Sequence, residues 1–119
     1  MPTAAASTSV TGTRPSAVAW IDDRHAYVAT NATSGDLLFS EIRPRDGAPG
    51  EDPTYVVRVA DAIGDRERIA IMGPDANRLA LERAYVTIFH RPDRLVDVEP
   101  SSLADRIEIA ERLRQLAAS

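Results

Sequence analysis

The segment Glu67-Arg-Ile-Ala-Ile-Met-Gly-Pro-Asp-Ala-Asn-Arg-Leu-Ala-Leu-Glu-Arg-Ala-Tyr85 carries the strongest structural signal in this sequence. An apolar run over residues 68–72 stops at Gly73 and Pro74, and apolar residues then recur at helical spacing. A strand, a tight turn and a helix in this order form the unit from which parallel α/β sheets are built. Ligands of such sheets bind outside the carboxyl ends of the strands, so Gly73, Pro74 and Asp75 form a possible ligand turn.

This turn carries little chemistry of its own. It contains no lysine, no glycine-rich cradle for a phosphate and no evident nucleophile. Pro74 also removes one backbone donor that a phosphate could have used. The segment therefore predicts an architecture and a place where a ligand would lie, but it predicts no reaction.

Three short strands are predicted upstream of this segment. They cover residues 17–21, 25–30 and 37–42, and polar clusters rich in Asp, Asn, Ser and Gly separate them. We expect an antiparallel meander. Asp52 and Pro53 then resemble an N-cap and a first helical residue, and Gly64 is a natural end for that helix.

The remaining elements follow the same logic. A helix is expected from Asp75 to about residue 86, a short strand over residues 95–98 and a final helix capped by Ser102 with Asp105 in a capping box. The order β-β-β-α-β-α-β-α predicts an α/β domain with a mixed five-stranded sheet flanked by helices, a ribonuclease-H-like topology. Residues 1–16 have no apolar period and are predicted to be a disordered tail, and residues 17–119 a single domain.

Composition excludes several functions. The 119 residues include no cysteine and no lysine, so thiolate metal sites, cysteine nucleophiles and lysine chemistry are ruled out. All 14 basic residues are arginine, and the net charge of −4 argues against broad nucleic-acid binding. No apolar run is long enough for a membrane span and no signal peptide is apparent, so a cytoplasmic protein is expected.

Few residues suggest a catalytic or metal site. Asp22 ends the first predicted strand and could hold Mg²⁺, but aspartate is equally favoured in a hairpin turn. His25 and His90, the two histidines of the chain, lie on separate turns without the spacing of metal ligands. We predict no metal and no cofactor.

The longest irregular stretch inside the domain is the loop over residues 43–52. Loops of this length in a compact domain are often functional. Arg43 and Arg45 flank Pro44 and are candidate contacts to phosphate groups, although solvated loop charge explains them too.

Several pieces together resemble a known family. They are Ala17-Val-Ala-Trp-Ile-Asp-Asp-Arg-His-Ala-Tyr-Val28, Glu51-Asp52, Arg68-Ile-Ala-Ile-Met-Gly-Pro-Asp75 and Val96-Asp-Val-Glu-Pro100. The chain resembles short bacterial proteins labelled translational-machinery proteins, which are similar to the central domain of eukaryotic and archaeal class-one peptide-chain release factors. The resemblance covers residues 17–116.

The resemblance implies a ribonuclease-H-like fold without nuclease activity and partners such as the ribosome or transfer RNA. In full release factors, a Gly-Gly-Gln loop between the third strand and the first helix promotes hydrolysis of peptidyl-transfer RNA. The matching loop here has Gly47 and Gly50 but no Gly-Gly pair, and Gln115 is the only glutamine of the chain. We therefore expect a non-enzymatic module that contacts the ribosome or transfer RNA through Arg43, Arg45, Gly47 and Gly50.

Two other functions stay open. One is a small nucleotide-binding protein or metal-dependent phosphoester hydrolase that uses Asp22 and the Gly73-Pro74-Asp75 turn. The other is a homodimeric structural or interaction protein that pairs through an exposed sheet edge.

Overall fold

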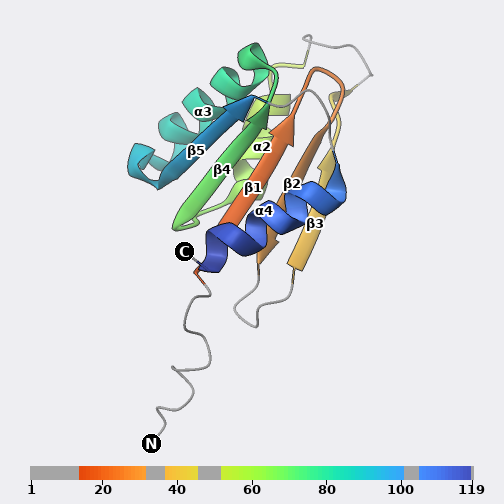
Figure 1. Ribbon diagram of the computed structural model, residues 1–119. Coiled ribbons are helices and arrows are strands. Elements are labelled where there is room, and N and C mark those ends of the chain that lie inside the picture. Colours follow the sequence, from red (N-terminus) through yellow and green to blue (C-terminus); the bar gives the residue numbers. More distant parts are fainter. Residues whose placement is uncertain (1–13, 32–36, 46–51, 101–104, 119) are drawn as a thin grey trace, which may run out of the picture.

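The structure is a computed structural model, and it describes residues 14–31, 37–45, 52–100 and 105–118, with backbone alone for residues 96–100. Its elements follow the predicted order (Figure 1). They are β1 (Ser16–Ile21), β2 (Ala26–Asn31), β3 (Leu37–Ile42), α2 (Tyr55–Ile63), β4 (Arg68–Gly73), α3 (Asp75–Phe89), the 3-10 turn η2 (Pro92–Arg94), β5 (Leu95–Pro100) and α4 (Arg106–Ala118).

One mixed sheet carries the strands in the order β3-β2-β1-β4-β5. β1 pairs with β2 and β2 with β3 in antiparallel fashion, as expected for strands that only a few residues separate in the sequence. β1 pairs with β4 and β4 with β5 in parallel, since α2 and α3 serve as the crossover connections. The predicted combination of an antiparallel meander and parallel crossovers is confirmed.

Helices cover both faces of this sheet (Figure 1). α2 and α3 pack on one face, where Ile21, Ile71 and Tyr85 belong to a single buried cluster. α4 packs on the other face, where Leu113 contacts a second cluster that includes Trp20. All six residues of β1 are buried because helices cover both faces of the sheet at this central strand. Its sequence therefore does not alternate between apolar and polar residues.

Several boundaries differ from those predicted. β1 begins at Ser16, whose backbone N–H donates to Oδ1 of Asn31 at 2.7 Å, so the strand starts inside the segment assigned to the tail. α2 begins at Tyr55 rather than at Pro53, because the Asp52 carboxylate accepts the N–H of Thr54 and holds a turn before the helix. The prediction of Asp52 as the N-cap was therefore wrong by two residues.

The start of α4 also differs from the prediction. The helix begins at Arg106, and Asp105 lies before it with Oδ1 accepting the N–H of Ile107 at 2.9 Å. Asp105 is thus itself the capping residue. Ser102, the predicted partner in a capping box, lies outside the described residues. Among the described residues, no helix combines the length and the apolar character that a membrane crossing requires.

Candidate functional site

The turn between β1 and β2 is closed by the side chain of Asp22. Its Oδ1 accepts the backbone N–H groups of Arg24 at 2.8 Å and His25 at 2.9 Å, and it lies 3.7 Å from Nδ1 of His25. Asp23, the next residue, accepts a hydrogen bond from the Asn77 amide at 2.8 Å. Both carboxylates at this sheet end therefore have structural partners, and the described residues contain no group of three potential metal ligands.

The Gly73-Pro74-Asp75 turn is filled by the protein itself. Gly73 is buried with φ of +128°, and a Cβ atom there would lie 2.2 Å from the carbonyl oxygen of Ile21. The glycine is required because β4 and the end of β1 approach so closely. Arg78 donates through Nε to the Gly73 carbonyl at 3.0 Å and forms an ion pair with Asp75.

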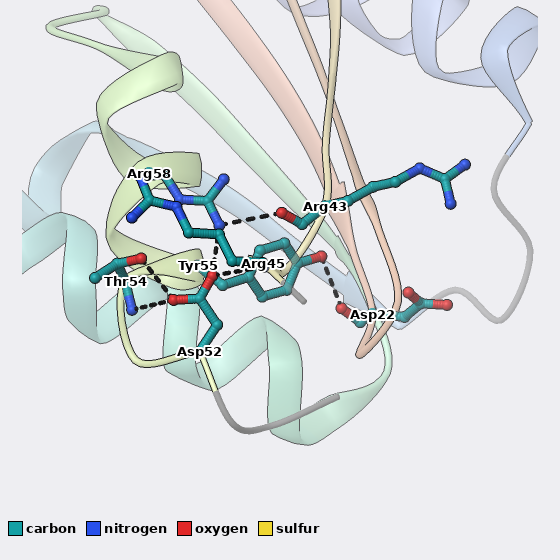
Figure 2. Close-up of polar contacts among 7 residues, drawn as sticks. All are labelled: Asp22, Arg43, Arg45, Asp52, Thr54, Tyr55 and Arg58. Carbon is teal, nitrogen blue, oxygen red and sulfur yellow. Dashed lines mark hydrogen bonds and ion pairs between the residues drawn. The ribbon is translucent and has the colours of Figure 1, made fainter. Parts of the chain in front are cut away.

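The most elaborate polar site lies where the loop after β3 meets α2, and it consists of Arg43, Arg45, Asp52, Thr54 and Arg58 (Figure 2). We call this group the loop base. Oδ1 of Asp52 accepts the Thr54 N–H at 2.9 Å and the Thr54 hydroxyl at 2.6 Å. Oδ2 accepts the backbone N–H of Arg45 at 2.8 Å, so one carboxylate joins the two described ends of the loop.

Arg58 on α2 ties the same carboxylate to β3. Its Nη2 lies 2.6 Å from Oδ2 of Asp52 and donates to the carbonyl oxygen of Arg43 at 3.1 Å. At the first residue of α2, the Tyr55 hydroxyl donates to the carbonyl oxygen of Asp22 at 2.9 Å. These contacts fix the entry to the loop against α2 and against the β1–β2 turn, as Figure 2 shows.

The electrostatics of the loop base follow from these bonds. The Asp52 side chain is 7% exposed, and the hydrogen bond from Thr54, followed by those from Arg45 and Arg58, holds the pKa of its carboxyl far below the ordinary value of 3.8. Burial raises the pKa of the Tyr55 hydroxyl, and the nearby charges of Asp22 and Asp23 raise it further. Asp52 is thus an anion that organises donors, and Tyr55 is a neutral hydroxyl.

The loop base gives a pH prediction. A folded-state pKa below that of the unfolded chain means that ionised Asp52 stabilises the fold above its ordinary pKa of 3.8, and that this stabilisation is lost as the pH falls below that value. Asp52→Asn replaces one carboxylate oxygen by an amide N–H₂ group, which faces the hydrogen-bond donors of Arg45, Thr54 and Arg58 and cannot accept from them. We therefore expect a lower melting temperature than that of the wild type at neutral pH. The difference between the two melting temperatures should become smaller on acidification from pH 7 to about pH 3.

The control for this prediction is Asp61→Asn, on the exposed side of the same helix. This substitution removes an exposed carboxylate of α2 that does not belong to the loop base. The melting temperature of Asp61→Asn should therefore equal that of the wild type at neutral pH. Thermal unfolding followed by circular dichroism across the pH series measures both. A difference between wild type and Asp52→Asn that stays constant with pH would show that the Asp52 charge does not stabilise the loop base.

The predicted contact residues fall in and around this site. Arg43 directly follows β3, and its side chain points away from Asp52 (Figure 2). This side chain is 69% exposed and pairs with Glu41 at 2.8 Å. Arg45 is exposed and lies at the described end of the loop. Gly47 and Gly50 lie outside the described residues. Asp52 was predicted only as a helix cap. Arg58 was not predicted as part of the site, because nothing in the sequence links an arginine on α2 to the carbonyl of Arg43.

The fold defines the class of protein: a three-layer α/β domain, in which a mixed sheet with a meander at one edge and parallel crossovers at the other lies between helices. Among solved structures, the chain is similar to Archaeoglobus fulgidus Pelota, with a TM-score of 0.61 and 12% identity over 97% of this chain. The chain spans 35% of the length of that multidomain protein. No protein-family model and no curated protein sequence matches it. The likeness establishes a shared fold.

Proposed function

We propose that this chain is a ribonuclease-H-like domain related to the central domain of class-one release factors, and that it binds the ribosome or transfer RNA without catalysing a reaction. The observation that carries the proposal is the likeness to the release-factor-like protein Pelota over 97% of the chain. The strand order and the position of the loop between β3 and α2 agree with the family resemblance of the sequence.

The loop base supports a binding role over a catalytic one. The place that holds Gly-Gly-Gln in full release factors contains neither that motif nor a glutamine here. Asp52 and Arg58 use their polar groups to hold the two described ends of the loop together. Asp52 accepts hydrogen bonds from Arg45, Thr54 and Arg58, and Arg58 also donates to the carbonyl oxygen of Arg43. The exposed guanidinium of Arg43 is what the site offers to an RNA phosphate.

Ribosome cosedimentation across a salt series tests this function. We expect the wild type to pellet with ribosomes purified from the source cells at low salt and to dissociate as the salt rises, because phosphate contacts release counterions. Arg43→Ala should reduce the bound fraction a few-fold and lower the dependence of binding on salt by about one phosphate contact.

Arg114→Ala on α4 is the matched control. The Arg114 side chain is 65% exposed and pairs with Glu111 at 2.9 Å, much as Arg43 is 69% exposed and pairs with Glu41 at 2.8 Å. Both variants remove one exposed, paired arginine, but only Arg43 lies at the loop base. Equal losses in the two variants would contradict binding through this loop, and no pelleting of the wild type at the lowest salt would refute the proposed function.

A further inference from the structure

The strand β3 forms one edge of the sheet and is regular along its whole length (Figure 1). All six of its residues pair in uninterrupted register with β2, from Leu37 opposite Asn31 to Ile42 opposite Ala26. Within the part of the chain that the structure describes, no strand pairs with its other side. Half of the backbone donors and acceptors of β3 are thus available to another strand.

Proteins usually protect such an edge, and β3 lacks the usual protection. It contains no proline and no bulge, and its single charged residue, Glu41, is neutralised by Arg43 at 2.8 Å. Leu37 is 37% exposed and Leu38 is 55% exposed. At the opposite edge, β5 has a register shift against β4 and ends at Pro100, two features that discourage pairing.

We propose that the partner of this edge is a second copy of the chain, with two β3 strands pairing in antiparallel fashion about a two-fold axis at Ser40. Directly opposite residues of two antiparallel strands point to the same face of the sheet. The two-fold axis must therefore pass between two copies of the same residue, and it cannot pass midway between two neighbouring residues of the strand. An axis at Ser40 places Leu38 opposite the partner's Ile42. It also places the exposed Ser40 opposite the partner's Ser40 at the centre of the paired strands.

This register extends the core that is already present. Ile42 packs against the cluster formed by the sheet with α2 and α3, and Leu38 lies on the same face of β3 because two residues separate successive side chains on a face. Pairing Leu38 with Ile42 of the partner subunit therefore covers the most exposed leucine of the strand with an apolar neighbour.

Charge also favours a second copy over a charged partner. The Glu41–Arg43 ion pair leaves each edge with no net charge, so two identical edges approach without the repulsion that like charges cause across strands. The two-fold arrangement is closed, because it uses the β3 edge of both copies and leaves only the irregular β5 edges. The product is one continuous sheet through two subunits, and it does not depend on the proposed role in translation.

A cysteine cross-link tests the register. The chain has no cysteine, so Ser40→Cys introduces a single thiol that, at the axis, would face its own copy at a separation within the range that disulfides span. Mild oxidation should convert most of this variant into a disulfide-linked dimer. Thr87→Cys, which places an exposed thiol on α3, is the control and should remain largely monomeric on a denaturing gel. Equal cross-linking of the two variants would overturn the Ser40 register.

Light scattering tests the assembly without a cross-link. The wild type should have the mass of a dimer at tens of micromolar, and Leu38→Lys should have the mass of a monomer with an unchanged circular-dichroism spectrum. Leu79→Lys is the control, because Leu79 is 45% exposed but lies on α3. A monomeric wild type, or a Leu38→Lys variant that remains dimeric, would overturn the proposal. If Leu38→Lys fails to fold, Leu38→Thr is the milder substitute, and it should raise the dimer dissociation constant at least tenfold.

Discussion

Gly73→Ala should be among the most destabilising substitutions in this protein. Two costs add at this position: the backbone has φ of +128°, which side chains rarely adopt, and the new Cβ would lie 2.2 Å from the carbonyl oxygen of Ile21. Backbone strain of this kind costs about 1–3 kcal/mol and overpacking costs a similar amount, so we expect a loss of about 3–5 kcal/mol. The melting temperature should fall by roughly 10–20 °C.

Gly64→Ala separates the two costs. Gly64 ends α2 with φ of +73°, but the nearest atom to a Cβ there is the Asp61 carbonyl oxygen at 3.9 Å, an ordinary contact. The same substitution therefore carries backbone strain alone, at about 1–3 kcal/mol. Equal losses for Gly64→Ala and Gly73→Ala in urea unfolding would show that β4 can move away from Ile21 without cost.

The Gly73 result bears directly on the ligand turn. The sequence marked this turn because ligands of parallel sheets collect at the ends of their strands. In the structure, the backbone of β1 occupies the space beside Gly73, and the carbonyl oxygen of Gly73 accepts a hydrogen bond from Arg78. A glycine is thus needed here because β1 and β4 approach each other closely. A role for the turn in ligand binding stays a prediction.

The fold was largely predictable because its signals are local. An apolar run that stops at Gly73 and Pro74, and a glycine that ends a helix at Gly64, depend on the backbone preferences of single residues. The starts of α2 and α4 were missed because two caps differed from the predicted ones. Asp52 closes a turn ahead of its helix, and Asp105 itself caps the start of α4.

The position of the loop base could be predicted from the sequence, but its hydrogen bonds could not. Its position followed from the length of the loop and the arginines around Pro44. Its bonds join residues up to 15 positions apart, as between Arg58 and the carbonyl of Arg43, and they depend on how α2 crosses the end of β3. No local pattern encodes that crossing. The exposed edge was likewise predicted only in general terms, because strand order decides that β3 rather than β2 lies outermost.

Leu113→Ala should cause the other large loss of stability. Leu113 is 2% exposed on α4 and packs in the cluster that contains Val18, Trp20 and Ala70, on the sheet face that α4 covers. Truncating a buried leucine to alanine typically costs about 2–5 kcal/mol, because the apolar contact is lost and a cavity stays behind. Trp20 is the sole tryptophan and belongs to the same cluster, so its fluorescence reports the unfolding directly.

Ile107→Ala is the matched control on the same helix, because Ile107 is 76% exposed and should contribute less than about 0.5 kcal/mol. The comparison tests whether α4 is an integral layer of the domain. If it is, Leu113→Ala lowers the urea midpoint strongly, Ile107→Ala leaves it unchanged, and fluorescence and far-ultraviolet circular dichroism give coincident transitions. If α4 were a loosely attached helix, Leu113→Ala would separate the two transitions, with Trp20 exposed to water before the strands and the helices of the other face unfold.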